Sequence, residues 1–563
     1  MRSPGLIRLA PWLAIALFML PVAAGLIGTV LPAFGYLPAI GGMHFSLAPW
    51  RALFDQPGFW TSLRLTVQTG LLATLLALWL ALAFCARAGE QRLYRRLAAL
   101  VSPMLATPHV AVAVGLAFVI APSGWLVRLA SPLLTGWERP PTGLVTVRDP
   151  QGFAMVLGLL LKEVPYLVLM IAAALKQVPE KALRMTGAAL GYRGATLWLK
   201  LVLPLVYPQL RLPVYAVLAF SLSNVEVGLI LAPGNPPPLA LLAARWFSDY
   251  DLARYFPAAA AALLQLVVVL AALGLWRLAE LALARLGRAW CAGGRRGGWA
   301  VAWVHLGAAL GAAALVVGIA AILAMGLWSC AESWRFPAAW PEQWSIATWA
   351  SQAPRAWGSV ITTLTLALAS TLVAVALAIA CLESESQRRH APTERALWLA
   401  YAPLLVPQIA FLYGFQVALV RLALDGRWLA VAWAHLVFVL PYVFLSLADP
   451  WRALDPRLLR SAAALGASPW RRLWRVRLPM LLKPLLIAAA IGFAASVGQY
   501  LTTLFAGAGR IATLTTEAVT LSSGADRRIL GVYSVLQALF PWLAYLTAWA
   551  LPAWLYRHRK GMA

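Results

Sequence analysis

The sequence predicts an all-α, polytopic membrane protein of about twelve transmembrane helices, arranged as two parallel six-helix halves. Composition is the first reason, because 62% of the 563 residues are hydrophobic and only 12% are charged, which is too apolar for a soluble domain. Apolar runs such as 71–86 and 258–275 approach or exceed the length that a hydrocarbon core of about 30 Å requires of a helix. In addition, short motifs recur in the same order in both halves of the chain, as in a duplicated fold.

The expected spans follow the apolar runs, which do not alternate residue by residue and therefore predict helices and not a closed barrel. In the first half the spans cover about 10–31, 62–86, 98–121, 153–175, 204–226 and 256–280. In the second half they cover about 301–327, 357–381, 397–421, 428–449, 480–505 and 530–556. Arg2 and Arg8 precede the first run as in a signal peptide, but the run is longer than such a signal, so we expect a retained helix.

A Gly-rich, basic segment separates the two halves. Residues 285–300 read RLGRAWCAGGRRGGWA and are interpreted as a cytoplasmic linker. The chain is therefore expected to consist of a first core at 1–284 and a second core at 301–563.

The formal net charge of +26 is explained by membrane topology and not by a nucleic-acid partner. Most Lys and Arg residues fall in loops on one side of the predicted spans, and such loops face the cytoplasm. We therefore expect both termini in the cytoplasm and no nucleic-acid partner. The four cysteines and six histidines are scattered, which predicts neither a disulfide framework nor a metal site.

Motifs that match between the halves indicate parallel repeats. In chain order they are Trp60-Thr61-Ser62 with Trp357-Gly358-Ser359, Pro103, Pro108 and Gly115 with Pro403, Pro407 and Gly414, and Pro165-Tyr166 with Pro441-Tyr442. Because each half contains an even number of spans, both halves run in the same direction, related by a pseudo-two-fold axis along the membrane normal.

One short element occurs after the fourth span of each half. It reads LGYRGATLWLKLVLP at 190–204 and LGASPWRRLWRVRLP at 465–479, with thirteen positions from glycine to proline in both copies. In the second copy, Asp455-Pro456 and Ser468-Pro469 are helix starts, and Gly466 permits the positive-φ turn that ends the first short helix. The element is thus expected to be a helix–turn–helix on the cytoplasmic surface. A single copy would suit an ordinary interfacial helix, but two copies with fixed spacing favour a specific role.

The Gly followed thirteen residues later by Leu-Pro resembles the coupling loop of binding-protein-dependent ABC importer permeases of the type I fold. The resemblance covers nearly the whole chain and is closest to fused permeases of the ferric-iron and thiamine types. The coupling loops are then about 178–204 and 453–479. The residues assigned to ATPase coupling are Gly191, Trp198, Leu203, Pro204, Gly466, Trp470, Leu478 and Pro479.

The resemblance implies a set of partners in the bacterial inner membrane. Each loop would dock on one of two copies of a cytoplasmic ABC ATPase, and a periplasmic solute-binding protein would deliver a small-molecule substrate, docking on outer loops such as 122–150 and 328–354. The chain contains no G-x-x-x-x-G-K-[ST] motif, so ATP and Mg²⁺ are expected on the ATPase and no cofactor on this chain. The family's usual Glu, six residues before the glycine, is missing: the positions read Met185-Thr186-Gly187 and Arg460-Ser461-Ala462.

Polar residues within the spans are candidates for the translocation pathway, because ionisable groups are costly there. Lys162 and Glu163 lie in the fourth span, where the second half is apolar, and form either a gate or a structural pair with other helices. Asn224 and Glu226 in the fifth span, with Gln499 and Tyr500 in the eleventh, either line the pathway or form inter-helix hydrogen bonds.

Other functions remain open from the sequence alone. A twelve-helix secondary transporter, driven by an ion gradient through Lys162 and Glu163, would share the parallel halves but has no need of the paired loops. A sensor or scaffold is disfavoured, because no soluble domain is attached. The substrate is open among thiamine, ferric iron, polyamines and small oxyanions, with thiamine-like cations favoured by resemblance alone.

Overall fold

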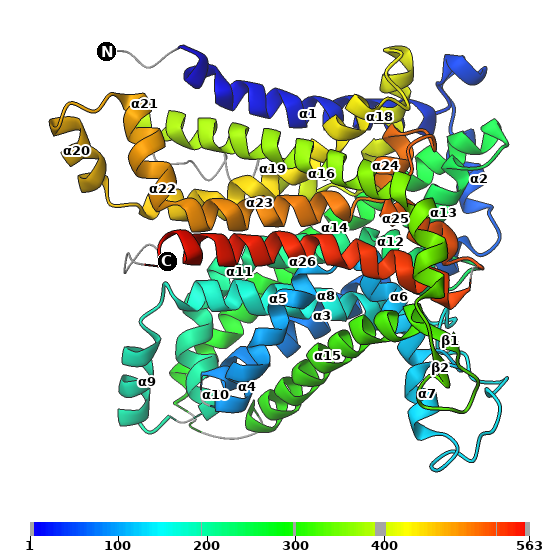
Figure 1. Cartoon of the computed structure of the whole chain (residues 1–563), viewed down its shortest axis with the longest axis horizontal. Helices are drawn as coiled ribbons and strands as arrows, with labels where there is room; N and C mark the ends of the chain where they lie inside the picture. Colours follow the sequence, from blue (N-terminus) through cyan, green and yellow to red (C-terminus); the bar gives the residue numbers. More distant parts are fainter. Residues whose placement is uncertain are drawn as a thin grey trace.

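The computed structural model is a bundle of long helices that run side by side (Figure 1). It describes residues 5–89, 91–192, 194–294, 296, 300–388, 401–524 and 526–557. Within these residues the only named strands are β1 (Ala331–Ser333) and β2 (Gln343–Trp344), which pair antiparallel. The predicted all-α class is confirmed.

The span helices of the first half are α1 (Gly5–Ala33), α3 (Phe59–Ala88), α5 with α6 (Val101–Ala106, His109–Ile120), α8 (Phe153–Leu175), α11 (Leu203–Ser223) and α14 (Tyr255–Ala292). Those of the second half are α15 (Ala300–Ser329), α16 (Ala347–Arg388), α18 (Gln408–Arg421), α19 (Trp428–Ala453), α23 (Leu482–Val497) and α26 (Arg527–Leu555). α14 continues to Ala292, so the first part of the predicted linker is helical, whereas residues 295 and 297–299 lie outside the described part.

Shorter helices connect the spans. Those at the loop ends are η1 (Pro38–Ile40), α2 (Ala48–Phe54), α4 (Arg92–Leu97), η2 (Ala98–Leu100), α7 (Trp125–Ala130) and η4 (Leu252–Arg254). The helices that flank the fifth span are α9 (Glu180–Ala189), α10 (Gly194–Leu197), η3 (Trp198–Val202), α12 (Glu226–Leu231) and α13 (Leu239–Phe247). Those that flank the eleventh span are α20 (Pro456–Ala464), α21 (Pro469–Arg472), η5 (Leu473–Arg477), α22 (Leu478–Met480), α24 (Leu501–Ala506) and α25 (Leu514–Leu521).

The number of continuous spans is lower than the predicted twelve. Within the described residues, ten helices are long and apolar enough to cross a membrane, or eleven if the pair Pro469–Met480 and Leu482–Val497, bent by 77°, counts as one. The predicted ninth span, 397–421, does not meet that length, because α18 has only 14 residues and residues 397–400 lie outside the described part.

Prolines explain why the third and ninth spans are broken. α5 ends before Thr107-Pro108, where Thr107 is extended, and α18 starts directly after Pro407. Proline lacks the amide hydrogen that an α-helix needs and pushes the residue before it out of helical geometry. The two breaks lie at the matched prolines, so the repeat extends to the interruptions of the helices.

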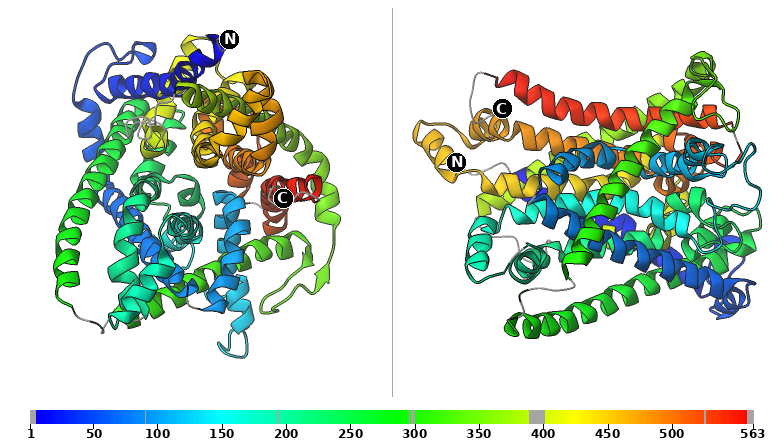
Figure 2. Two further views of the ribbon diagram at one scale, coloured as in Figure 1. Left: turned by 90° about the vertical axis from the view of Figure 1, so that its left-hand side faces the viewer. Right: turned by 90° about the horizontal axis from the view of Figure 1, so that it is seen from below.

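The first helix of each half packs on the third span of the other half. α1 contacts α18, and α15 contacts α6; in the left view of Figure 2, dark-blue α1 lies beside the yellow helix of the second half. A Cβ on Gly414 would meet the carbonyl oxygen of Gly25 at 2.0 Å, and one on Gly115 would meet that of Ala321 at 2.2 Å. The recurring glycine therefore allows two helix backbones to approach closely.

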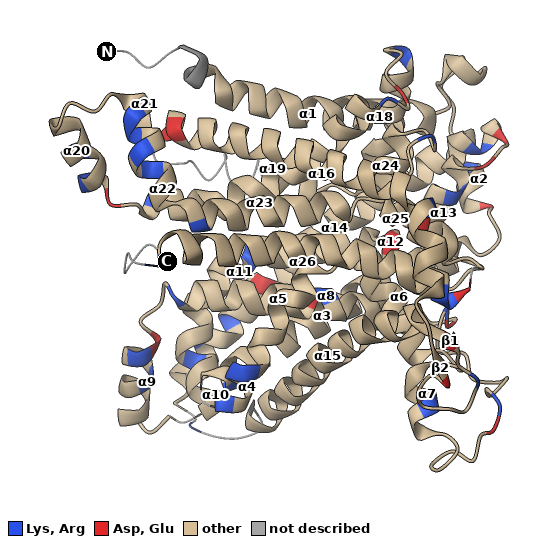
Figure 3. Ribbon diagram, viewed as in Figure 1, with Lys and Arg blue, Asp and Glu red and all other residues tan. Residues whose placement is uncertain are grey.

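One end of the bundle carries the repeated elements. α9 and α20 project there, at the left of Figure 1, together with the first turns of α1 and the last turns of α26. Most of the short outer elements (α2, α7, α13 and the β1–β2 hairpin) lie at the opposite end. Lys and Arg gather on α4, α9 and α21 at the first end (Figure 3), as expected for a cytoplasmic surface.

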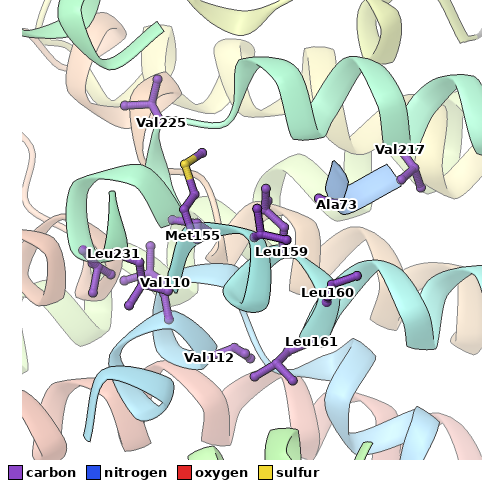
Figure 4. Close-up of a cluster of buried hydrophobic side chains, with 14 of the residues drawn as sticks. Ala73, Val110, Val112, Met155, Leu159, Leu160, Leu161, Val217, Val225 and Leu231 are labelled. Atoms are coloured by element: carbon purple, nitrogen blue, oxygen red, sulfur yellow. The ribbon is translucent and has the colours of Figure 1, made fainter. Parts of the chain in front are cut away.

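α8 lies in the most densely packed part of the first half. Met155, Leu159 and Leu161 are almost fully buried, and Figure 4 shows them among side chains of α3, α6, α11 and α12. This packing fixes the position of the charged residues that follow in α8.

Candidate coupling elements and translocation pathway

The two repeated elements have the same turn. Gly191 and Gly466 both have φ +82°, which is the left-handed conformation that glycine adopts without steric cost. The amide of Gly191 donates to the carbonyl of Ala188 and that of Gly466 to Ala463, both at 3.0 Å. The predicted glycine turn is confirmed in both copies.

The helix starts of the second copy are also confirmed. The Asp455 side chain accepts from the amide of Arg457 at 2.8 Å, and the Ser468 hydroxyl accepts from that of Arg471 at 3.3 Å. α9 has no such cap, and its first turn is instead tied by a Glu180–Arg184 ion pair at 2.8 Å. The two copies therefore share a turn but not a cap.

A wide π-type turn precedes the Leu-Pro pair in both copies. η3 ends at Val202, next to Leu203-Pro204, and η5 ends at Arg477, next to Leu478-Pro479. A proline four residues after a carbonyl leaves that carbonyl unbonded and clashes with it, which favours a widened turn. In the first copy the freed carbonyl of Lys200 is met by the thiol of Cys291, with 3.8 Å between sulfur and oxygen. The sequence analysis missed these turns, although the matched prolines were a signal for them.

The two tryptophans assigned to coupling have different surroundings. Trp198 is 1% exposed, and next to it the Lys200 ammonium donates to the carbonyl of Trp290 at 3.0 Å. Trp470 is 60% exposed and meets Trp474 edge to face, with ring centroids 5.6 Å apart. Trp198 corresponds in position to Leu473, which is buried. Trp198 therefore anchors the first element to the bundle, whereas Trp470 lies on the outside of the second.

Both elements present exposed surface at the end of the bundle. Apolar side chains such as Met185, Leu190 and Leu465 are more than half exposed. The second element carries four exposed arginines, which are Arg457, Arg460, Arg471 and Arg475. Among the described residues, none of these four forms an ion pair. The second surface is thus strongly cationic, while Glu180 offsets part of the charge on the first.

Lys162 donates hydrogen bonds at the break between α5 and α6. Its ammonium, on a side chain only 5% exposed, donates to the carbonyls of Met104, Leu105 and Thr107 at 2.9, 3.1 and 2.6 Å. These carbonyls lie where α5 ends, and Pro108 has no amide hydrogen to offer Met104. The contacts match the structural alternative for Lys162.

Asn224 and Glu226 lie at the break between α11 and α12. Asn224 Oδ1 accepts from the amide of Val227 at 2.7 Å and so caps α12. Glu226 Oε1 accepts from the amide of Tyr500, in the other half, at 3.2 Å. Gln499 Oε1 accepts from the hydroxyl of Thr502. The equivalent breaks of the fifth and eleventh spans therefore meet each other.

Two tyrosines that the sequence analysis noted only as repeat markers lie beside these residues. Tyr442 interacts electrostatically with Glu163, Glu226 and Tyr401, and Tyr166 with Glu163, Tyr401 and Tyr442. Tyr442 is 36% exposed although it follows a fully buried stretch of α19. The matched Pro-Tyr pairs were the available signal for this site.

The chain is similar to known membrane transport proteins. A profile of the family "Binding-protein-dependent transport system inner membrane component" matches residues 344–558. The chain is 31% identical over 560 residues, 98% of its length and 97% of the relative, to the inner membrane ABC transporter permease protein YnjC of Escherichia coli (strain K12). It is 32% identical over 187 residues, 30% of its length and 67% of the relative, to the molybdenum transport system permease protein ModB of Mycobacterium tuberculosis (strain H37Rv).

The chain matches YnjC over nearly the full length of that relative. It is a multi-pass membrane protein and not an enzyme, since ATP hydrolysis in these systems belongs to a separate subunit. The chain belongs to the family of inner-membrane permeases of binding-protein-dependent ABC transport systems.

Proposed function

We propose that this chain alone forms the membrane pathway of an ATP-driven importer, with both termini in the cytoplasm. A periplasmic binding protein delivers a small solute, and two copies of an ABC ATPase, which hold ATP and Mg²⁺, grip the pathway from the cytoplasm. The observation that carries the proposal is the pair of equivalent exposed elements, α9 and α20, at one end of the bundle. Residues 1–284 and 301–563 each supply one of them.

The proposed mechanism is a switch between two packings of the helices. When the ATPases close on ATP, they bind one separation of α9 and α20 better than the other, and this difference in affinity shifts the equilibrium. The force passes through the Gly191 and Gly466 turns into η3 and η5, and from there into α11 and α23. Buried Trp198 and the ion pair of Arg477 with Glu383 fix these turns to the bundle, so that movement of the short helices moves the spans.

Membership of this family does not identify the solute that the chain transports. ModB is named for molybdenum transport, yet it matches only 30% of this chain. Thiamine-like cations, ferric iron, polyamines and small oxyanions are the candidates. The rival function, a secondary transporter driven by an ion gradient, gives the two exposed elements no role.

The test uses the permease purified with the ATPase encoded next to it. Valine at Gly191 or Gly466 is strained at φ +82°, so we expect Gly191→Val or Gly466→Val to lose one bound ATPase and the double variant to lose both. Gly287→Val is the matched control, because a Cβ there meets nothing within 4 Å. Uptake that continues without any ATPase and collapses with the proton gradient would contradict the proposal.

A further inference from the structure

Four buried polar side chains bind the interrupted fifth and eleventh spans in the same way, and we call them the frame residues. They are Thr66 and Gln265 in the first half and Thr363 and Gln537 in the second. We propose that they are positioning residues for translocation, because each pair fixes a broken span and the short helix after it to its own half. The inference rests on the proposed importer function and identifies which parts of the chain move together.

The two threonines bind the first amide of the short helices α13 and α25. Thr66 Oγ1 in α3 accepts from the amide of Leu239 at 2.8 Å. Thr363 Oγ1 in α16 accepts from the amide of Leu514 at 2.9 Å. The first amides of a helix have no partner within it. Each threonine lies six positions after the tryptophan that opens the matched motif of its half, so this contact belongs to the repeat.

The two glutamines satisfy carbonyl groups at the breaks. Gln265 Nε2 in α14 donates to the carbonyl of Leu222, in the last turn of α11, at 3.2 Å. Gln537 Nε2 in α26 donates to the hydroxyl of Thr515 at 2.6 Å. That hydroxyl donates to the carbonyl of Val497, the last residue of α23. The last carbonyls of a helix lack a partner within it, so each glutamine ties the end of the broken span to the last span of its own half.

One sequence difference explains why the second glutamine acts through a hydroxyl. Leu239 and Leu514 occupy equivalent positions, since each binds the matched threonine of its half. The residues that follow them, Ala240 and Thr515, are therefore equivalent as well. Alanine has no polar group, and the first glutamine binds the carbonyl directly, whereas the threonine hydroxyl bridges the second glutamine to its carbonyl.

The frame residues are inaccessible to solvent. Gln265 and Gln537 are 0% exposed, Thr66 is 1% exposed and Thr363 is 3% exposed. Breaking such a bond leaves a buried polar group without a partner, which is unfavourable. Neither glutamine Oε1 has a hydrogen-bond partner within the described part of the chain, so the amide donor is the group that makes the contact. We therefore expect the frame to stay intact when the two halves change their packing.

The short helices also lie on the opposite half, where the contacts of α13 differ in kind. α13 packs on α18, and α25 packs on α6. Phe247 of α13 stacks on Tyr413 of α18 with ring centroids 4.0 Å apart, and Phe505 of α24 meets Phe247 edge to face at 6.0 Å. Among the residues that the structure describes, no hydrogen bond joins α13 to α18. α13 can therefore leave α18 without losing a hydrogen bond, while it remains bonded to its own half.

The experiment follows the contact between α13 and α18 in the permease–ATPase complex. The four native cysteines are replaced by serine, Phe247→Cys and Tyr413→Cys are introduced, and a short bifunctional thiol reagent is added. We expect cross-linking without nucleotide, because the two rings are in contact. With ATP and vanadate, which hold the ATPases closed and favour the other packing, we expect the yield to fall at least about fivefold.

Variants of the frame test whether α13 follows the rest of its half. Thr66→Val keeps the shape of the side chain but removes the hydroxyl, and Gln265→Met removes the amide donor. In both, we expect ATP and vanadate to change the yield by less than about twofold, and Thr66→Ser should restore the response. Thr74→Val is the matched control, because Thr74 is 0% exposed in the same helix and its hydroxyl donates to the carbonyl of Gly70 in α3 at 2.8 Å.

Size-exclusion chromatography of each variant with the ATPase separates a positioning defect from a folding defect. If Gln265→Met does not assemble, the comparison of Thr66→Val with Thr66→Ser decides the question. A response in Thr66→Val equal to that in Thr74→Val would overturn the inference, and so would a yield that nucleotide leaves unchanged in the intact frame, while ATP-dependent uptake would still support the importer function. Absence of an ATPase complex with the unaltered chain would instead overturn the importer function itself.

Discussion

The crossing of α1 over α18 predicts a large cost for one added methyl group. A Cβ on Gly414 would lie 2.0 Å from the carbonyl oxygen of Gly25 and 2.7 Å from the carbonyl carbon of Gly28. Both neighbours are backbone atoms, so no side-chain rotation relieves the overlap and α1 must move away. Overpacking of this kind costs about 1 to 3 kcal/mol, and we expect Gly414→Ala to reach the upper part of that range.

Thermal unfolding in detergent, followed by size-exclusion chromatography of the heated protein, measures this cost. Because the unfolding entropy grows with chain length, a loss of this size lowers the melting temperature of a chain of 563 residues by roughly 2 to 3 °C. Gly326→Ala in α15 is the matched control, because a Cβ there has no neighbour within 4 Å, and it should melt as the wild type does. The repeat adds a second test, since Gly115→Ala meets Ala321 at 2.2 Å and should be destabilised likewise. If Gly414→Ala melted together with Gly326→Ala, the close approach of α1 and α18 would be wrong.

Three further predictions concern the pathway and the coupling elements. Lys162→Met leaves three carbonyls without this donor and should destabilise the protein by roughly 1 to 3 kcal/mol, measured by the same thermal assay; an unchanged melting temperature would contradict this. Pro204→Ala or Pro479→Ala restores an amide hydrogen, lets η3 or η5 relax towards an α-helix, and should lower the solute transported per ATP hydrolysed. An unaltered ratio would show that the wide turns have no part in coupling. Arg471→Glu or Arg475→Glu should weaken ATPase binding and reduce its salt dependence, measured by titration at two ionic strengths, and equal affinities for wild type and variant would refute a contact between these arginines and the ATPase.

Local chemistry made the coupling elements predictable. Asp455, Ser468 and Gly466 each act on backbone groups within a few residues, so their effect can be read from adjacent letters. The same reasoning did not reveal η3 and η5, because the widened turn depends on a proline four residues further along the chain.

The interrupted spans show the limit of a hydropathy argument. Residues 98–121 and 397–421 are apolar enough for continuous helices, yet Pro108 and Pro407 break them. The freed carbonyls of the first break are satisfied by Lys162, more than 50 positions away in the sequence. That partnership depends on how α8 packs against α5, and no local pattern encodes it.

The sequence also did not predict that α1 and α15 each pack against a helix of the other half. The sequence marks Gly115 and Gly414 as a matched pair, and a small residue in a span indicates a close helix contact. It does not say which helix makes the contact, since α1 and α18 lie almost 400 positions apart in the chain. Lys162, Glu163 and Glu226 were found as candidates because charge is rare in a membrane, whereas Tyr166 and Tyr442 were noted only as markers of the repeat.

The stoichiometry of the complex tests the central claim most directly. Native mass spectrometry of the permease purified with its neighbouring ATPase should give one permease with two ATPases, because one chain carries two equivalent docking elements, α9 and α20. A permease that is found alone, or with a single ATPase under conditions where the ATPase is in excess, would contradict the account.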